Sequence, residues 1–93
     1  MVEIEHVEGN NKGKVFLYAL STCVWCKKTK ELLNDLDIEY SYVFIDKLDS
    51  KDRDEQMKEL EKWNPRCSFP TLVINDKKCI TGFKEEEIRK ELE

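Results

Sequence analysis

Two cysteines separated by two residues are the part of this 93-residue sequence best suited to chemistry. The segment Cys23-Val24-Trp25-Cys26 follows an apolar run typical of a strand and precedes apolar residues at helical spacing. Unpaired backbone N–H groups and the helix dipole stabilise an anion at a helix start, so we expect the pKa of Cys23 to fall below the usual value of about 8.5. Because the thiolate is the form that attacks disulfides, this position predicts a nucleophilic Cys23.

Cys26 lies one helical turn beyond Cys23, within reach of its sulfur, and we expect it to be more buried and less acidic. In the predicted mechanism Cys23 forms a mixed disulfide with a substrate, and Cys26 then attacks Cys23 and leaves a Cys23–Cys26 disulfide. A C-x-x-C pair is also half of many zinc sites, but a position between a strand and a helix favours the redox role. Trp25 is expected to be exposed and to contact partner proteins, because aromatic residues are enriched at interfaces.

The second feature is a proline at the start of a predicted strand, in Ser68-Phe69-Pro70-Thr71. Proline has no N–H group, and a cis Phe69–Pro70 bond at a strand start, opposite the cysteine pair, would explain its presence. In that arrangement the backbone groups of Phe69 are free to pair with an extended substrate. A trans proline is the simpler alternative, because only about 5–6% of X-Pro bonds are cis.

Cys67 and Cys79 bring the number of cysteines to four. If all four sulfurs converged, they would form a ligand set for zinc or an iron–sulfur cluster, which is the alternative function that the sequence leaves open. The 12-residue interval between Cys67 and Cys79 differs from zinc-ribbon spacing. We therefore favour a Cys67–Cys79 disulfide or two inert buried thiols, and its place beside the proline makes Cys67 a candidate auxiliary thiol.

Strands and helices must alternate around these residues to bring them together. Apolar or β-branched runs predict strands, and apolar residues three or four positions apart predict helices. The predicted strands cover residues 14–20, 39–45, 71–74 and 78–80, and the predicted helices begin after Cys23, at Lys51 and at Glu85. Asn75-Asp76-Lys77 predicts a tight hairpin turn between the last two strands. The resulting order, β-α-β-α-β-β-α, predicts an α/β fold with a central mixed sheet flanked by helices.

Composition and charge describe one small domain. Hydrophobic residues make up 40% of the chain and charged residues 39%, and the net charge is −4. Lysines and arginines are scattered, whereas nucleic-acid or anionic-membrane binding needs a clustered basic face, so we expect neither partner. No apolar stretch approaches the ~18 residues of a membrane span, and the first residues lack the pattern of a signal peptide. We therefore expect a cytoplasmic protein.

The beginning of the chain is polar and ends in Gly9-Asn10-Asn11-Lys12-Gly13. We expect residues 1–13 to form a flexible N-terminal segment or an edge strand, and residues 14–93 to form the domain. His6 lies in this segment without a predicted partner that would make it a catalytic base, so we assign it to the surface.

Taken together, these segments resemble the glutaredoxin family. The resemblance rests on Ser21-Thr22-Cys23-Val24-Trp25-Cys26 after a strand, on Ser68-Phe69-Pro70-Thr71 before a hairpin and on Ile80-Thr81-Gly82-Phe83 before an acidic helix. It covers about residues 14–92 and implies a thioredoxin fold, a cis bond at Pro70, a nucleophilic Cys23 and a resolving Cys26. The substrate-binding residues that we infer are Trp25, Ser68, Phe69, Pro70, Thr81 and Gly82.

The resemblance implies a thiol-disulfide oxidoreductase that reduces protein or low-molecular-weight disulfides by dithiol exchange. Its redox group would be the Cys23–Cys26 disulfide, with no metal or bound cofactor, and we expect a monomer. Glutathione as a co-substrate and a protein reductase are both open as electron donors. The electron donor is open because the sequence departs from the usual residues of the family at the positions linked to glutathione. Val24-Trp25 stands in place of Pro-Tyr, Ser68-Phe69 in place of Thr-Val, Thr81-Gly82 in place of Gly-Gly, and Leu20 in place of lysine.

Overall fold

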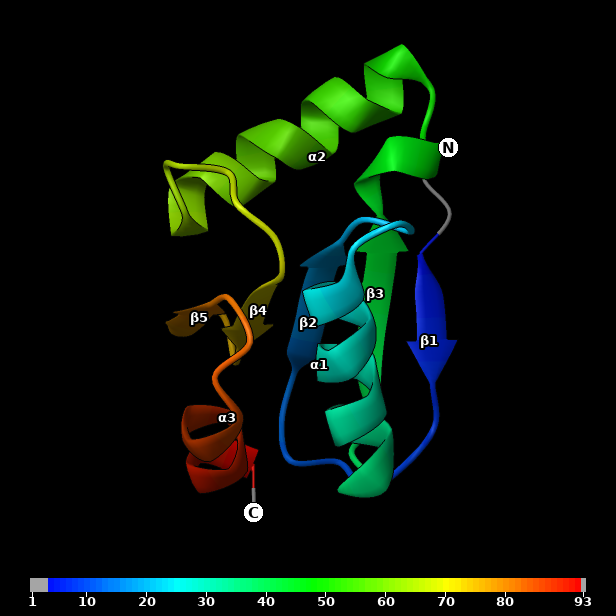
Figure 1. Ribbon diagram of the computed structural model, residues 1–93. Helices are drawn as coiled ribbons and strands as arrows, with labels where there is room; N and C mark the ends of the chain where they lie inside the picture. Colours follow the sequence, from blue (N-terminus) through cyan, green and yellow to red (C-terminus); the bar gives the residue numbers. More distant parts are fainter. Residues whose placement is uncertain (1–3, 93) are drawn as a thin grey trace.

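The computed structural model describes residues 4–92, so residues 1–3 of the predicted N-terminal segment and Glu93 lie outside the described part. Five strands form one sheet in the order β1-β3-β2-β4-β5 (Figure 1). Their bounds are Glu5–Val7 for β1, Val15–Ala19 for β2, Tyr40–Phe44 for β3, Thr71–Ile74 for β4 and Lys78–Thr81 for β5. Strands β2 and β3 are parallel and the other neighbours are antiparallel, which confirms the predicted mixed sheet.

Three α-helices begin close to where the sequence predicts them: α1 (Val24–Asp35), α2 (Ser50–Trp63) and α3 (Glu85–Leu92). The side chain of Asp49 caps α2 by accepting a hydrogen bond from the Asp52 N–H at 2.9 Å. A short 3₁₀ helix, η1 (Ile45–Lys47), follows β3 and was not predicted. None of the helices among residues 4–92 has the length and apolar character to cross a membrane.

The sheet separates two apolar clusters. On one face, buried side chains of α1 and α3 pack against the sheet, among them Leu33 and Ile88, both at 0% exposure. On the other face, Leu60 of α2 packs with Tyr18 and Val43 of the sheet. Figure 1 shows α1 in front of β2 and β3 and running along them, with α3 at the lower left and α2 near the end to which β2 and β3 point. Buried side chains thus fix α1 against the strand that leads into it.

The register of the strands brings distant segments to one end of the sheet. Ala19 pairs with Phe44 at the carboxyl ends of β2 and β3, and Tyr18 pairs with Thr71 at the start of β4. The cysteine segment follows β2, and Pro70 immediately precedes β4. Both features that the sequence singles out therefore lie at the same end of the sheet.

Candidate active site

Cys23 is the N-cap residue of α1, as predicted, with extended backbone angles of φ −90° and ψ 117°. Its Sγ accepts a hydrogen bond from the Cys26 N–H at 3.1 Å, and its carbonyl oxygen accepts one from the Lys27 N–H at 3.1 Å. Hydrogen bonds to a sulfur favour its ionised form. The first turn of α1 contains no acidic residue, so no carboxylate competes with a thiolate for this helix start.

Cys26 is completely buried, at 0% exposure, in contrast to the half-buried Cys23. Burial raises the pKa of Cys26 to about 12; a hydrogen bond to the Cys23 side chain raises it as well, whereas one from the Leu20 backbone lowers it. The prediction that Cys26 is the more buried of the two thiols is confirmed. Both residues are free thiols in this structure.

A carboxylate holds the turn that leads into Cys23. The Cys23 N–H donates to the Leu20 carbonyl oxygen at 3.2 Å and closes this turn. Within it, the Ser21 N–H donates to Asp46 Oδ1 at 2.8 Å, and the Ser21 hydroxyl donates to Asp46 Oδ2. Desolvation opposes ionisation of Asp46, but the two hydrogen bonds from Ser21, the Asp46 backbone and the charge of Lys47 together lower the pKa of the carboxyl. Sequence reasoning missed this contact.

The loop before β4 is built around Asn64, which is 6% exposed at the end of α2. Its Nδ2 donates to Ser68 Oγ at 2.8 Å and to Thr71 Oγ1 at 3.1 Å. The Thr71 hydroxyl in turn donates to the Ser68 carbonyl oxygen at 2.8 Å. The Phe69–Pro70 peptide bond between these anchors is cis, which confirms the prediction.

A hollow of about 210 Å³ lies beside the cysteines, lined by Trp25, Phe69, Pro70, Gly82 and Phe83. The Trp25 and Phe83 rings are stacked, with centroids 6.0 Å apart and planes at 23°. Trp25 is 56% exposed, as predicted. The Gly82 N–H donates to the Pro70 carbonyl oxygen at 2.7 Å, in a backbone conformation with φ +80° that favours glycine.

Four of the predicted binding residues, Trp25, Phe69, Pro70 and Gly82, thus meet at one surface. Ser68 instead anchors its own loop through Asn64, and Thr81 pairs with Thr71 across β4 and β5. Phe83 was not among the predicted binding residues; the only signal in the sequence is an aromatic residue directly after Gly82. Substrate binding by all these residues stays a prediction.

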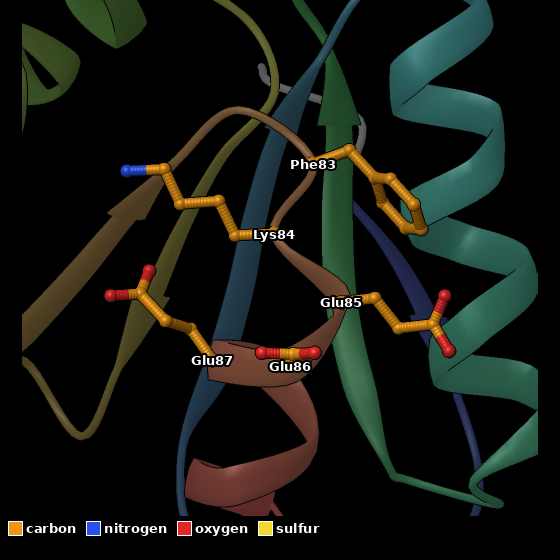
Figure 2. Close-up of a pocket in the computed structure, with 5 residues that line it drawn as sticks. All are labelled: Phe83, Lys84, Glu85, Glu86 and Glu87. Atoms are coloured by element: carbon orange, nitrogen blue, oxygen red, sulfur yellow. The ribbon is translucent and has the colours of Figure 1, made fainter.

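A second hollow, of about 670 Å³, adjoins the first at Phe83 and is lined by Lys84, Glu85, Glu86 and Glu87. Figure 2 shows the side chains of Phe83 and Glu85 pointing toward α1, and those of Lys84 and Glu87 pointing toward β5. Glu85 accepts a hydrogen bond from Arg89 Nε at 2.9 Å. Three carboxylates in the first turn of α3 give this side of the site an acidic character.

The remaining cysteines do not join the pair. Cys67 and Cys79 are half-buried free thiols, so the predicted Cys67–Cys79 disulfide is wrong for this structure. Burial raises the pKa of the Cys79 thiol, and the positive charge of Lys84 partly opposes this. Cys67 packs at the margin of the apolar cluster beneath α2, in a loop conformation with φ +52°. The surrounding loop holds Cys67 in this backbone conformation, and its thiol forms no disulfide.

Within residues 4–92, the side chains close enough together to hold a metal ion are those of His6, Glu8 and Glu39, and no cysteine is among them. The geometry therefore does not support a four-cysteine metal centre. His6 Nδ1 and Ser41 Oγ are hydrogen-bonded at 2.8 Å on the exposed edge strand β1. The cluster lies at the start of β3, at the opposite end of the sheet from the cysteine pair.

Comparison with known proteins gives consistent matches. The family model described as Glutaredoxin matches residues 15–80. The crystal structure of the glutaredoxin from Methanosarcina mazei Go1 is 54% identical, with a TM-score of 0.89, over 96% of this chain and 86% of that chain. That of Methanosarcina acetivorans methanoredoxin is 50% identical, with a TM-score of 0.88, over 90% of this chain and 88% of that chain. An uncharacterized glutaredoxin-like 8.6 kDa protein in the rubredoxin operon of Clostridium pasteurianum is 36% identical over 77 residues, 83% of this chain and 95% of that protein.

Proposed function

This chain belongs to the glutaredoxin family and has a thioredoxin-like α/β fold, and from this premise we propose that it reduces protein or low-molecular-weight disulfides by dithiol exchange. The observation that supports the proposal is the unequal environment of two neighbouring thiols. Cys23 caps a helix and accepts a backbone N–H, while Cys26 is buried and its pKa is raised to about 12. An accessible nucleophile and a protonated partner are what two-step exchange requires.

In the first step the Cys23 thiolate attacks one sulfur of the substrate disulfide. The substrate S–S bond breaks, a mixed disulfide between Cys23 and the substrate forms, and the other substrate sulfur leaves as a thiolate that takes a proton from solvent. This step consumes the Cys23 thiolate, whose charge and hydrogen bond are among the causes that raise the pKa of Cys26. Losing both contributions makes Cys26 easier to deprotonate at the moment when it is needed.

In the second step Cys26 attacks the Cys23 sulfur and its proton passes to the departing substrate thiolate. The protein ends with a Cys23–Cys26 disulfide, and the substrate gains two electrons and two protons as two thiols. We propose that the Trp25, Phe69, Pro70 and Gly82 hollow receives the substrate segment next to the disulfide, with Ser68 and Thr81 supporting its walls. A protein reductase or glutathione would return the pair to the dithiol form, in a monomer working in a reducing cytoplasm.

Titration against a glutathione or dithiothreitol redox buffer, followed by Trp25 emission, tests the proposal. We expect one reversible two-electron transition, because Trp25 lies between the two cysteines. Replacing Cys23 by serine should reduce disulfide turnover to the uncatalysed background, while Cys67→Ser retains it. Turnover that persists in the Cys23 variant would exclude this mechanism. Supplying the same model disulfide with glutathione and its reductase, or with a thioredoxin-type reductase, identifies the electron donor.

A further inference from the structure

We propose that Asp46 is a positioning residue for the dithiol exchange: by holding Ser21, its carboxylate fixes the turn from Leu20 to Cys23 and so the approach of the two sulfurs. The inference rests on the proposed function. It assigns a role to a residue that touches neither cysteine through a hydrogen bond and that local sequence patterns give no reason to select.

The contact follows from the parallel pairing of β2 and β3. Ala19 and Phe44 are register partners, so the chain leaves both strands at the same level. Two residues further along each segment, Ser21 and Asp46 lie opposite each other and form two hydrogen bonds, from the Ser21 N–H and from its hydroxyl. Because Asp46 is in η1, directly after β3, its backbone is fixed to the sheet.

The turn that Asp46 holds reaches both thiols. The Leu20 carbonyl oxygen accepts the Cys23 N–H at 3.2 Å, which sets the N-cap residue relative to β2. The Leu20 backbone also lowers the pKa of the buried Cys26 thiol. Ser21 follows Leu20 directly, and it is only half-buried, so packing alone does not immobilise it. Its two bonds to Asp46 supply that restraint.

The Asp46 carboxylate could act by holding Ser21 in position or through its negative charge, and two substitutions separate these effects. The negative charge of Asp46 is one of the causes that raise the pKa of Cys26, but the last of them. Asparagine keeps an acceptor for the Ser21 N–H and can donate to its hydroxyl oxygen, so Asp46→Asn removes the charge and retains the restraint. Alanine removes both.

The measured quantity is the effective concentration of one thiol toward the other, obtained from equilibration of the full-length protein with dithiothreitol. We expect Asp46→Ala to lower it by about tenfold, because the two lost hydrogen bonds together are worth about that factor, and the reduction potential should rise by about 30 mV. Asp46→Asn should stay within about twofold of the wild type, because exposed charges are strongly screened. Ser21→Ala, which loses one of the two bonds, should lie between them.

Asp49→Ala is the matched control. It removes another carboxylate–backbone hydrogen bond, to the Asp52 N–H at 2.9 Å, from the helix cap that follows η1. It should lower the urea midpoint and leave the effective concentration unchanged, which separates positioning from general destabilisation. An unchanged value in Asp46→Ala, or equal losses in Asp46→Ala and Asp46→Asn, would overturn the inference. If the wild type itself forms no exchangeable disulfide, the proposed function fails instead.

Discussion

Helices α1 and α3 both begin beside the hollow that Trp25 and Phe83 line, and the residues at their positive ends differ. The first turn of α1 carries no acidic residue, and the atom at its cap is the Cys23 sulfur. The first turn of α3 carries Glu85, Glu86 and Glu87. The stacked rings of Trp25 and Phe83 join the two helix starts. The start of a helix is therefore available to an anion formed during a reaction where no permanent carboxylate already occupies it.

The two helix starts also differ in how deeply their titratable side chains are buried. The α1 end encloses a titratable group, Cys26, whereas the glutamates of the α3 end are exposed. We expect effects of different size from titrating the buried thiol, from adding a carboxylate to the start of α1 and from removing one from the start of α3.

The largest effect that we expect is a loss of stability of the reduced protein at alkaline pH. The folded pKa of Cys26 is raised from 9.0 to about 12, so the unfolded chain loses this proton first as the pH rises. The stabilising contribution is complete below about pH 9 and disappears as the pH rises through about 12, with a slope of at most about 1.4 kcal/mol per pH unit. Urea unfolding of the reduced protein between about pH 8 and about pH 10 measures it.

Cys26→Ser is the control for this prediction. Tyr40, whose pKa burial raises to about 12, is present in both proteins and cancels in the comparison. The difference in unfolding free energy between wild type and Cys26→Ser should therefore shrink steadily through this range. Parallel stability curves for the two proteins would contradict the assignment of Cys26 as the buried, weakly acidic thiol.

A smaller effect should follow from making the α1 start resemble the α3 start. Val24 is 64% exposed in the first turn of α1, so Val24→Glu adds a carboxylate there without disturbing the core. The carboxylate competes with the thiolate for the helix dipole, and we expect alkylation of Cys23 near neutral pH to slow by about two- to fivefold at low salt. Val24→Gln controls for side-chain size. Equal rates in the two variants would show that the dipole does not govern this thiol.

The smallest effect concerns the reverse change at α3. Glu86→Gln removes an exposed carboxylate from the first turn, where it interacts favourably with the dipole, and should cost about 0.3–1 kcal/mol of unfolding free energy at low salt. Glu61→Gln, near the carboxyl end of α2, lacks this interaction and should cause no such loss. A loss as large in Glu61→Gln as in Glu86→Gln would argue against a dipole effect.

Local patterns in the sequence are sufficient to predict most of what positions the reactive pair. The run from Val15 to Ala19 forms β2, and apolar spacing after Cys23 forms α1, because one buried strand and one amphipathic helix each leave a periodic signature. The 3₁₀ helix η1 leaves none, since it contains only three residues. Phe83 leaves no periodic signature either, because its role depends on stacking against Trp25, which is distant in the sequence.

The contacts that hold the site in place could not be predicted in this way. Asp46 and Ser21 are 25 positions apart, and only the β2–β3 register brings them together. A single aspartate after a strand has the appearance of an ordinary solvated residue. No local pattern points to Asn64 either, yet its amide organises the loop that carries Pro70. The Cys67–Cys79 disulfide failed for the same reason, because pairing depends on tertiary geometry rather than on spacing.

The antiparallel pairing of β2 with β4 has a consequence for how the chain tolerates change. One strand leads to the thiols and the other begins just after Pro70, and four residue pairs from Val15↔Ile74 to Tyr18↔Thr71 align them. A shift of this alignment by two residues would keep each side chain on its own face and still displace the proline along β2 by about 6.7 Å. A change of length in the connection through α2 must therefore leave both this alignment and the Asn64 contacts of the proline loop in place.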